Sequence, residues 1–320
     1  MAVWIGIVVF LFCFVSVPPV IALAWRIGAV DVPRDWRRMH RTSIPRAGGL
    51  CIYASFLVGC LLLGAPSGRL TCALSGGGLL LLVGLADDIC CLGPWTKLFF
   101  QIAVTVATVF GYGFSSDFRA FEAVLWVIAL TNAHNFIDGL DGLFAGCAGI
   151  EGICLGVTLF WNAKPEALPV FFLAVACFAF WLYNRFPARI FAGDCGSETV
   201  GFLLGVFSLP LLETTVGGFS AFAPLFLFAY PLTDLCAAVL RRLLRGKNPF
   251  AADRAHLHHR LTAAGLNQVQ CGRVLLSVSA ALGGVGILLS VGRAQLPAAV
   301  ACLGAAVLLT RLRRYVLYFA

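Results

Sequence analysis

The sequence predicts an all-α, polytopic integral membrane protein with about eleven transmembrane helices, forming a single transmembrane domain over residues 1–320. Of its 320 residues, 60% are hydrophobic and only 12% are charged. The mean hydropathy is +0.93. Both values lie outside the range of soluble globular domains. Apolar windows of roughly membrane-spanning length recur along the chain, separated by polar or Gly/Pro breaks.

Eleven windows are predicted to span the bilayer. They cover approximately residues 3–25, 48–64, 70–86, 98–113, 121–136, 143–160, 168–183, 199–212, 218–240, 274–291 and 296–309. The first is interpreted as a retained span, because no basic region precedes it and no small-residue cleavage site follows it. The ninth contains Pro224 and Pro231, so we expect a kinked or broken helix there.

The distribution of basic residues predicts the orientation. With the N-terminus outside, nineteen of the 23 Lys and Arg residues fall in loops on the cytoplasmic side. The other four are Arg69, Arg119, Lys164 and Arg293. The main cytoplasmic loops are then residues 26–47, 87–97, 131–142, 184–198 and 241–273. The C-terminus is also cytoplasmic.

Four polar motifs fall on this one predicted face: GLADDI, NFIDGLDG, FAGDCGSE and ADRAHLHHRL. The outer loops are short and carry few charges. A transporter is expected to place ionisable residues near the middle of the bilayer. The asymmetry therefore favours an enzyme that works at one membrane face.

Asp87 and Asp88 end the third predicted span, where the helix dipole already presents negative charge. They need a compensating cation, either Lys97 or Mg²⁺; the alternative is a solvated acid pair at the membrane interface. Asp194 begins the eighth span, where backbone N–H groups favour anions and Gly193 permits close approach of a phosphate. Asp194 or Ser197 could instead simply cap that helix.

The segment NAHNFIDGLDG brings amide and carboxyl side chains together at one helix junction. Asn132, Asn135 and Asp138 suit a polar ligand, whereas Asp141 could also be a helix cap, and His134 could be a packed, hydrogen-bonded histidine. In the last motif, three histidines lie between Arg254 and Arg260. These are His256, His258 and His259. They favour a pyrophosphate over zinc, because no cysteine lies close by.

Carboxylates for a hard divalent cation and Arg, Lys and His for phosphate oxygens are the groups that phosphoryl transfer requires. Their position at a membrane face indicates a lipid substrate. No nucleic-acid partner is expected.

Six ordered motifs from residue 31 to 261 resemble the polyprenyl-phosphate N-acetylhexosamine-1-phosphate transferases, glycosyltransferase family 4. They are DVPRDWRRMHRTSIPRAGGL, GLADDICCLGPWTKLFFQ, NAHNFIDGLDGL, YNRFPARIFAGDCGSETVGFLLG, YPLTD and NPFAADRAHLHHRL. The resemblance implies a Mg²⁺-dependent enzyme, with Mn²⁺ as a substitute, in the bacterial inner membrane. It implies transfer of a sugar 1-phosphate from a UDP-N-acetylhexosamine to undecaprenyl phosphate with release of UMP, a step that begins a cell-envelope polysaccharide such as O-antigen.

The resemblance also implies roles for individual positions. Asp87, with Asp88 beside it, would deprotonate or orient the lipid phosphate that Lys97 holds, and Asp194 would bind Mg²⁺. The nucleotide side would be formed by Asn135, Asp138, Asp141, Asn184, Phe191 and Gly193, with Asn132 nearby. The pyrophosphate would contact His258 and His259, supported by Arg254 and His256. Arg41 and Arg46 would contact substrate from the first inner loop.

The spacing from the acid pair to Lys97 and the HLHH sequence resemble the WecA-type branch. An MraY-type enzyme acting on UDP-N-acetylmuramoyl-pentapeptide is the alternative within the family, and a membrane transporter of nucleotide-sugar or lipid is the alternative from another class. The sequence leaves open which N-acetylated sugar is used, which polymer is begun, whether an aspartyl intermediate forms, and whether the protein is a monomer or a homodimer.

Overall fold

The apolar stretches fold into helices because the backbone polar groups of a membrane span have no water to bind and must bond within the segment. The computed structural model describes residues 1–33, 42–64, 66, 68–115, 118–213, 222–246, 248 and 256–291. Within these ranges, seven helices are long and apolar enough to cross a membrane. The predicted polytopic, all-helical membrane fold is confirmed. The count of eleven spans and the orientation of the termini stay predictions.

The seven long apolar helices are α1 (Ala2–Ile27), α3 (Gly68–Cys90), α5 (Phe118–Ile137), α6 (Leu143–Trp161), α7 (Ala167–Asn184), α8 (Asp194–Glu213) and α12 (Gln268–Ser290). The other described helices are α2 (Gly48–Leu62), α4 (Pro94–Gly111), α9 (Ala223–Leu227), α10 (Ala229–Leu244) and α11 (Leu257–Ala263). Together these helices overlap ten of the eleven predicted windows, of which the ninth begins with four residues, 218–221, outside the described residues. The eleventh window, 296–309, lies outside the described residues.

One helix break agrees with the sequence prediction, and one helix boundary differs from it. The ninth window is broken at Phe228 into α9 and α10, as expected, because Pro231 has no N–H to bond the carbonyl of Leu227. Helix α3 continues to Cys90, past the predicted end at residue 86. Asp87 and Asp88 therefore belong to the last turn of α3 rather than to the loop that follows.

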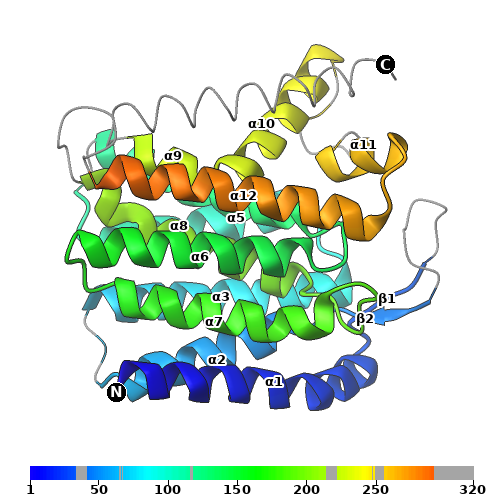
Figure 1. Cartoon of the computed structure of the whole chain (residues 1–320), viewed down its shortest axis with the longest axis horizontal. Helices are drawn as coiled ribbons and strands as arrows, with labels where there is room; N and C mark the ends of the chain where they lie inside the picture. Colours follow the sequence, from blue (N-terminus) through cyan, green and yellow to red (C-terminus); the bar gives the residue numbers. More distant parts are fainter. Residues whose placement is uncertain are drawn as a thin grey trace.

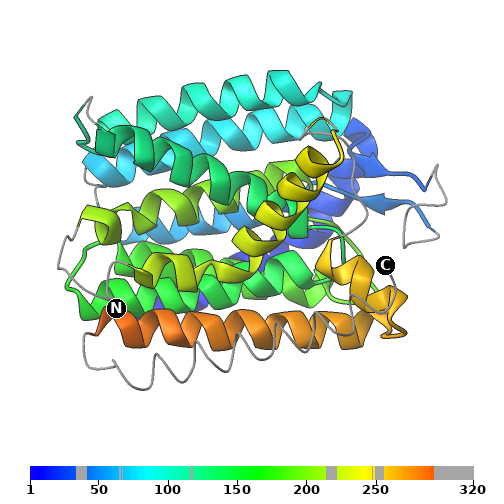
Figure 2. The ribbon, with the colours of Figure 1, turned by 90° about the horizontal axis from the view of Figure 1, so that it is seen from above.

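The helices pack side by side along a common direction. In Figure 1, α12, α6, α7 and α1 form one layer, with α5, α8, α3 and α2 behind it. Seen from above in Figure 2, α12 (orange) lies along one edge and α3 and α4 (cyan) along the opposite edge. Helix α8 packs against α2, α3 and α5 and is almost wholly buried. A helix that is apolar on every side is expected in such a central position.

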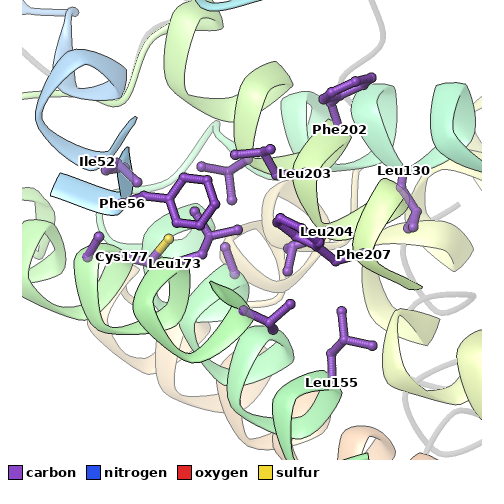
Figure 3. Packing of buried hydrophobic residues seen from close by; sticks show 14 of the residues in the cluster. Ile52, Phe56, Leu130, Leu155, Leu173, Cys177, Phe202, Leu203, Leu204 and Phe207 are labelled. Atoms are coloured by element: carbon purple, nitrogen blue, oxygen red, sulfur yellow. The ribbon is translucent and has the colours of Figure 1, made fainter. Parts of the chain in front are cut away.

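Large side chains from five helices fill the core around α8 (Figure 3). The rings of Phe56 on α2 and Phe207 on α8 meet edge to face, with centroids 6.0 Å apart. Leu130, Leu155 and Leu173 bring α5, α6 and α7 into the same core. Because lipid chains are as apolar as leucine, close packing rather than exclusion from water holds such helices together.

A small antiparallel pair of strands, β1 (Val30–Asp31) and β2 (Ile44–Pro45), projects from one end of the bundle (Figure 1). No element was predicted from the sequence at these positions. The backbone of Arg46, directly after β2, forms a bridge with Phe191. This bridge places the first polar loop against the start of α8.

Candidate active site

Helix α3 approaches the start of α8 so closely that only glycine fits at the crossing. A Cβ atom on Gly84 would lie 2.5 Å from the Cα of Cys195. Asp88 follows Gly84 by one helical turn and so lies on the same face of α3. The glycine therefore brings the acidic end of α3 onto the first residues of α8.

Asp88 caps α8 from another helix. Its Oδ1 accepts a hydrogen bond from the backbone N–H of Asp194 at 3.0 Å, and its Oδ2 accepts one from Cys195 at 3.0 Å. Its Oδ1 also lies 2.6 Å from Nη2 of Arg46, and the Asp88 side chain is fully buried. Two N–H groups that a helix start leaves unpaired are thus satisfied by a carboxylate, which the helix dipole also favours.

Gly193 makes room for this cap. Its φ of +73° is a left-handed conformation that favours glycine, and a Cβ atom there would lie 2.5 Å from Oδ2 of Asp88. The sequence predicted that Gly193 permits close approach of a phosphate. In the structure, the group that lies close to Gly193 is the carboxylate of Asp88.

Lys97, in the first turn of α4, binds three carboxylates. Its Nζ lies 3.0 Å from Oδ2 of Asp87 and 2.7 Å from Oε1 of Glu198, and it also contacts Oδ2 of Asp194. Lys97, one of the two expected cations, pairs with Asp87, whereas Asp88 pairs with Arg46, which the sequence did not predict for this role. Both acids are buried, so the alternative of a solvated pair is wrong.

Arg46 links the carboxylate of Asp88 on α3 to the carboxylate of Asp194 on α8. Its Nη2 lies 3.3 Å from Oδ1 of Asp194 as well as 2.6 Å from Asp88. Burial alone would lower the pKa of Arg46, but the carboxylates of Asp88 and Asp194 outweigh burial and raise it. The guanidinium therefore stays charged, and it holds the end of α3 to the start of α8.

The asparagines of α5 face the same cluster. Asn135 donates from Nδ2 to Oε1 of Glu198 at 3.3 Å and accepts at Oδ1 from the Ser197 hydroxyl at 3.1 Å. Asn132 donates to Oε1 of Gln101 on α4 at 2.8 Å. These bonds hold the amide groups beside the carboxylates.

Asp138, in the turn after α5, is electrostatically coupled to the cluster. Burial raises the pKa of its carboxyl well above the ordinary value, and the nearby carboxylate of Asp194 raises it further. The carboxyl of Asp138 is therefore a stronger base than an exposed aspartate.

Asp141 does not cap α6. The residue before α6 is Gly142, at a φ of +75° and without a side-chain cap. Instead, Oδ2 of Asp141 accepts a hydrogen bond from the backbone N–H of Ala188 at 3.0 Å. Asn184 similarly donates from Nδ2 to the carbonyl of Ile190 at 3.0 Å, and its buried Oδ1 has no partner in the described part of the chain. Both side chains fix the loop that carries Phe191.

The histidine motif packs against the turn between α5 and α6. His256 bonds through Nδ1 to Oδ2 of Asp234 at 2.9 Å, and Oδ1 of Asp234 accepts from the N–H of Leu257, where α11 begins. His258 lies directly against Gly139, since a Cβ atom there would be 2.9 Å from Nε2. Among the described residues, neither ring nitrogen of the buried His258 has a hydrogen-bond partner.

We predict a pH effect from His258. Burial lowers its pKa to about 3, and the neighbouring His259 and His256 add to this shift. The unfolded chain, with an ordinary pKa of 6.5, takes up a proton that the folded protein excludes. Stability from this group is full above pH 6.5 and is lost as the pH falls toward 3, by up to about 1.4 kcal/mol per pH unit.

The expected result is a melting temperature that falls between pH 6.5 and pH 5 in purified wild-type protein, and falls less in His258→Gln. Thermal unfolding followed by tryptophan fluorescence measures both. Equal slopes in the two proteins would contradict a buried neutral imidazole.

His134 is the packed histidine that the sequence left as an alternative. It is fully buried between α5 and α6, where Nδ1 bonds the carbonyl of Leu130 and Nε2 bonds Oε2 of Glu151, both at 2.8 Å. Both of its ring nitrogens are therefore occupied by groups outside the acid cluster.

Comparisons with known proteins show which family this chain belongs to. A profile of glycosyl transferase family 4 matches residues 70–211. A probable undecaprenyl-phosphate N-acetylglucosaminyl 1-phosphate transferase of Bacillus subtilis (strain 168) is 34% identical over 278 residues, covering 82% of this chain and 77% of the relative. The undecaprenyl-phosphate alpha-N-acetylglucosaminyl 1-phosphate transferase of Escherichia coli (strain K12) is 30% identical over 293 residues, covering 83% and 78%. The chain belongs to glycosyl transferase family 4.

Another relative of this family 4 chain is a decaprenyl-phosphate N-acetylglucosaminephosphotransferase of Mycobacterium tuberculosis (strain ATCC 25618 / H37Rv). It is 32% identical over 310 residues, covering 82% of this chain and 76% of the relative. The family predicted from the six motifs is confirmed. Two substrate residues implied by the resemblance, Arg41 and Arg254, lie outside the described residues.

Sequence reasoning missed three polar residues of this family 4 site: Gln101, Glu198 and Asp234. Glu198 follows Asp194 by four residues, so both lie on one face of α8, and this spacing was a signal that could have identified it. Asp234 stands in the YPLTD motif. Its pairing with His256 depends on a tertiary contact between α10 and the start of α11.

Proposed function

We propose that this chain transfers N-acetylhexosamine 1-phosphate from a UDP-sugar to undecaprenyl phosphate, releasing UMP and forming a lipid-linked sugar pyrophosphate. The product would begin synthesis of a cell-envelope polysaccharide. The observation that carries the proposal is the Lys97 ammonium held among three carboxylates at one end of a bundle of membrane spans. The names of the relatives support N-acetylglucosamine as the sugar and a polyprenyl phosphate as the acceptor.

We further propose that the site faces the cytoplasm of a bacterial inner membrane, with the N-terminus outside. The support is the bias of nineteen basic residues against four between the two sets of predicted loops. In that orientation a soluble UDP-sugar meets the site from the cytoplasm. The acceptor phosphate reaches it from the bilayer.

The residues present fit a hard divalent cation such as Mg²⁺, or Mn²⁺ in its place. Four carboxyl groups, of Asp87, Asp88, Asp194 and Glu198, share two basic groups, and Oε2 of Glu198 is buried without a partner among the described residues. No group of three His, Cys, Asp or Glu side chains in the described part of the chain is arranged around an empty ion position, and the Lys97 ammonium occupies the place where three of the carboxylates meet.

Asp194 and Asp87 would hold the cation, which when bound supplies positive charge against the pyrophosphate of the UDP-sugar.

The reaction forms one P–O bond and breaks another. An oxygen of the lipid phosphate attacks the β-phosphorus of the UDP-sugar, and the bridging oxygen leaves with UMP. Lys97 and Arg46 would hold phosphate oxygens, and Asp87 would accept a proton from, or orient, the lipid phosphate. His258 and His259 would contact the pyrophosphate, with His256 held in place by Asp234. Most of the catalytic effect would then come from positioning and charge.

The test is release of UMP by purified protein given undecaprenyl phosphate and a panel of UDP-sugars. We expect UMP from at least one UDP-N-acetylhexosamine, only when the acceptor lipid is present. Release from UDP-N-acetylmuramoyl-pentapeptide alone would instead identify an MraY-type enzyme. Flux of a UDP-sugar or of lipid across proteoliposomes without UMP would favour a transporter and contradict the proposal.

A further inference from the structure

Lys97 uses all of its hydrogen-bonding capacity on the protein itself. An ammonium group has three N–H donors. Nζ of Lys97 has three carboxylate partners, Asp87, Asp194 and Glu198. No donor remains for a phosphate oxygen in this arrangement. To hold a substrate phosphate, the ammonium must first leave at least one carboxylate.

Glu198 has an acceptor that nothing in the described structure satisfies. Its side chain is fully buried. Its Oε1 lies 2.7 Å from Nζ of Lys97 and accepts a hydrogen bond from Nδ2 of Asn135 at 3.3 Å. Its Oε2 is buried and has no hydrogen-bond partner among the described residues. Leaving a buried carboxylate oxygen unpaired is costly, so the position favours a ligand that binds this oxygen.

Glu198 and Asp194 also repel each other unless a cation lies between them. They are four residues apart on α8, where like charges destabilise a helix. With Asp87 and Asp88, the buried cluster contains four carboxyl groups for the single charges of Lys97 and Arg46. A monovalent ammonium at the centre leaves this imbalance, whereas a divalent cation reduces it.

We infer that Glu198 is a further ligand of the divalent cation, and that the cation and the Lys97 ammonium exchange at the same carboxylates. The inference rests on the proposed function, which supplies the need for a cation at this site. Binding of the ion releases Lys97 from Glu198 and Asp194. The freed ammonium can then donate to a phosphate oxygen. Binding of the cation and release of Lys97 for the substrate would therefore occur in one exchange.

The exchange predicts opposite effects for two substitutions. Glu198→Gln removes a ligand charge and should weaken binding of Mn²⁺ at least about tenfold. Lys97→Met removes the competing ammonium and should strengthen Mn²⁺ binding several-fold. If Glu198 only anchored Lys97, Glu198→Gln would release the ammonium and leave Mn²⁺ binding unchanged, which would overturn the inference.

Binding is measured by electron paramagnetic resonance of free Mn²⁺ titrated into the purified full-length protein. Glu166→Gln is the matched control, because Glu166 is also a buried glutamate with an unpaired Oε2, but it precedes α7 at the far end of the bundle. Its Mn²⁺ affinity should equal that of the wild type. Should Glu198→Gln fail to fold, Lys97→Met decides, since unchanged or weaker binding in that variant would also overturn the inference.

The proposed transferase function and the inference about Glu198 are contradicted by different results. Wild-type protein that binds Mn²⁺ through Glu198 but releases no UMP from any UDP-sugar would contradict the proposed function alone. Wild-type protein that releases UMP, with Mn²⁺ binding insensitive to Glu198→Gln, would contradict only the inference about Glu198.

Discussion

Replacement of Asp194 by Asn is expected to lower the rate of UMP release by about two to three orders of magnitude, the range seen when one preorganised electrostatic contact is lost. Asp194 contacts both basic groups of the cluster: Oδ1 lies 3.3 Å from Arg46, and Oδ2 contacts Lys97. The amide keeps the shape of the side chain but removes the charge. It therefore weakens the hold on Arg46 and Lys97, and on the proposed divalent ion.

The fold should survive this change. The backbone N–H of Asp194, not its side chain, makes the bond to Asp88, so the start of α8 keeps its cap. UMP release and thermal unfolding are measured on the same preparation. Glu122→Gln, an exposed position in the first turns of α5 at the other end of the bundle, is the control. A near wild-type rate in Asp194→Asn would rule out the role assigned to this carboxylate.

Long apolar elements were predictable because a membrane span needs a fixed number of apolar residues, which a window detects. The break at Phe228 was also predictable, since proline cannot donate a helical hydrogen bond. The strands β1 and β2 were not, because two-residue strands have no periodicity to detect. Helix α11 was missed for a related reason: its seven residues lie in a loop rich in Arg and His.

Site residues were predictable where a charged side chain is unfavourable for the local helix and therefore needs a partner. Two carboxylates at a helix C-terminus demand a cation, which led to Lys97. Glu198 gave no such conflict, because acids near a helix start are ordinary, and its four-residue spacing from Asp194 was the weaker signal. Its importance depends on the packing of α8 against α4 and α5, which brings Lys97 and Asn135 to it. The different roles of Asp87 and Asp88 likewise depend on where α8 begins.

Replacement by asparagine is expected to have different effects at Asp87 and at Asp88, although the two residues are adjacent on one helix turn. Asp87 contacts the Lys97 ammonium and is partly accessible to a ligand, with its side chain 10% exposed. Asp88 is fully buried and bonds two backbone N–H groups and Arg46. We therefore predict that Asp87→Asn loses turnover while its expression and melting temperature stay close to those of the wild type.

For Asp88→Asn we predict loss of stability together with turnover. An asparagine has one acceptor oxygen for two N–H groups, and its NH₂ group would face Arg46 or a backbone N–H that also donates. Breaking a buried charge pair costs about 3 kcal/mol, which lowers the melting temperature by several degrees. The displaced start of α8 carries Asp194 away from Lys97, so the rate falls because the cluster loses its geometry.

Thermal unfolding and UMP release of the two variants, purified side by side, separate these roles. The informative quantity is the difference between them, because both substitutions replace a carboxylate by an amide at neighbouring positions. A normal melting temperature with lost turnover in Asp88→Asn would mean that Asp88 takes part in the chemistry itself. A destabilised Asp87→Asn would mean that the Lys97 contacts, rather than the Asp88 cap, hold α3, α4 and α8 together. The predicted pattern makes Asp88 a positioning residue, which fixes the helix from which Asp194 and Glu198 reach the cation site.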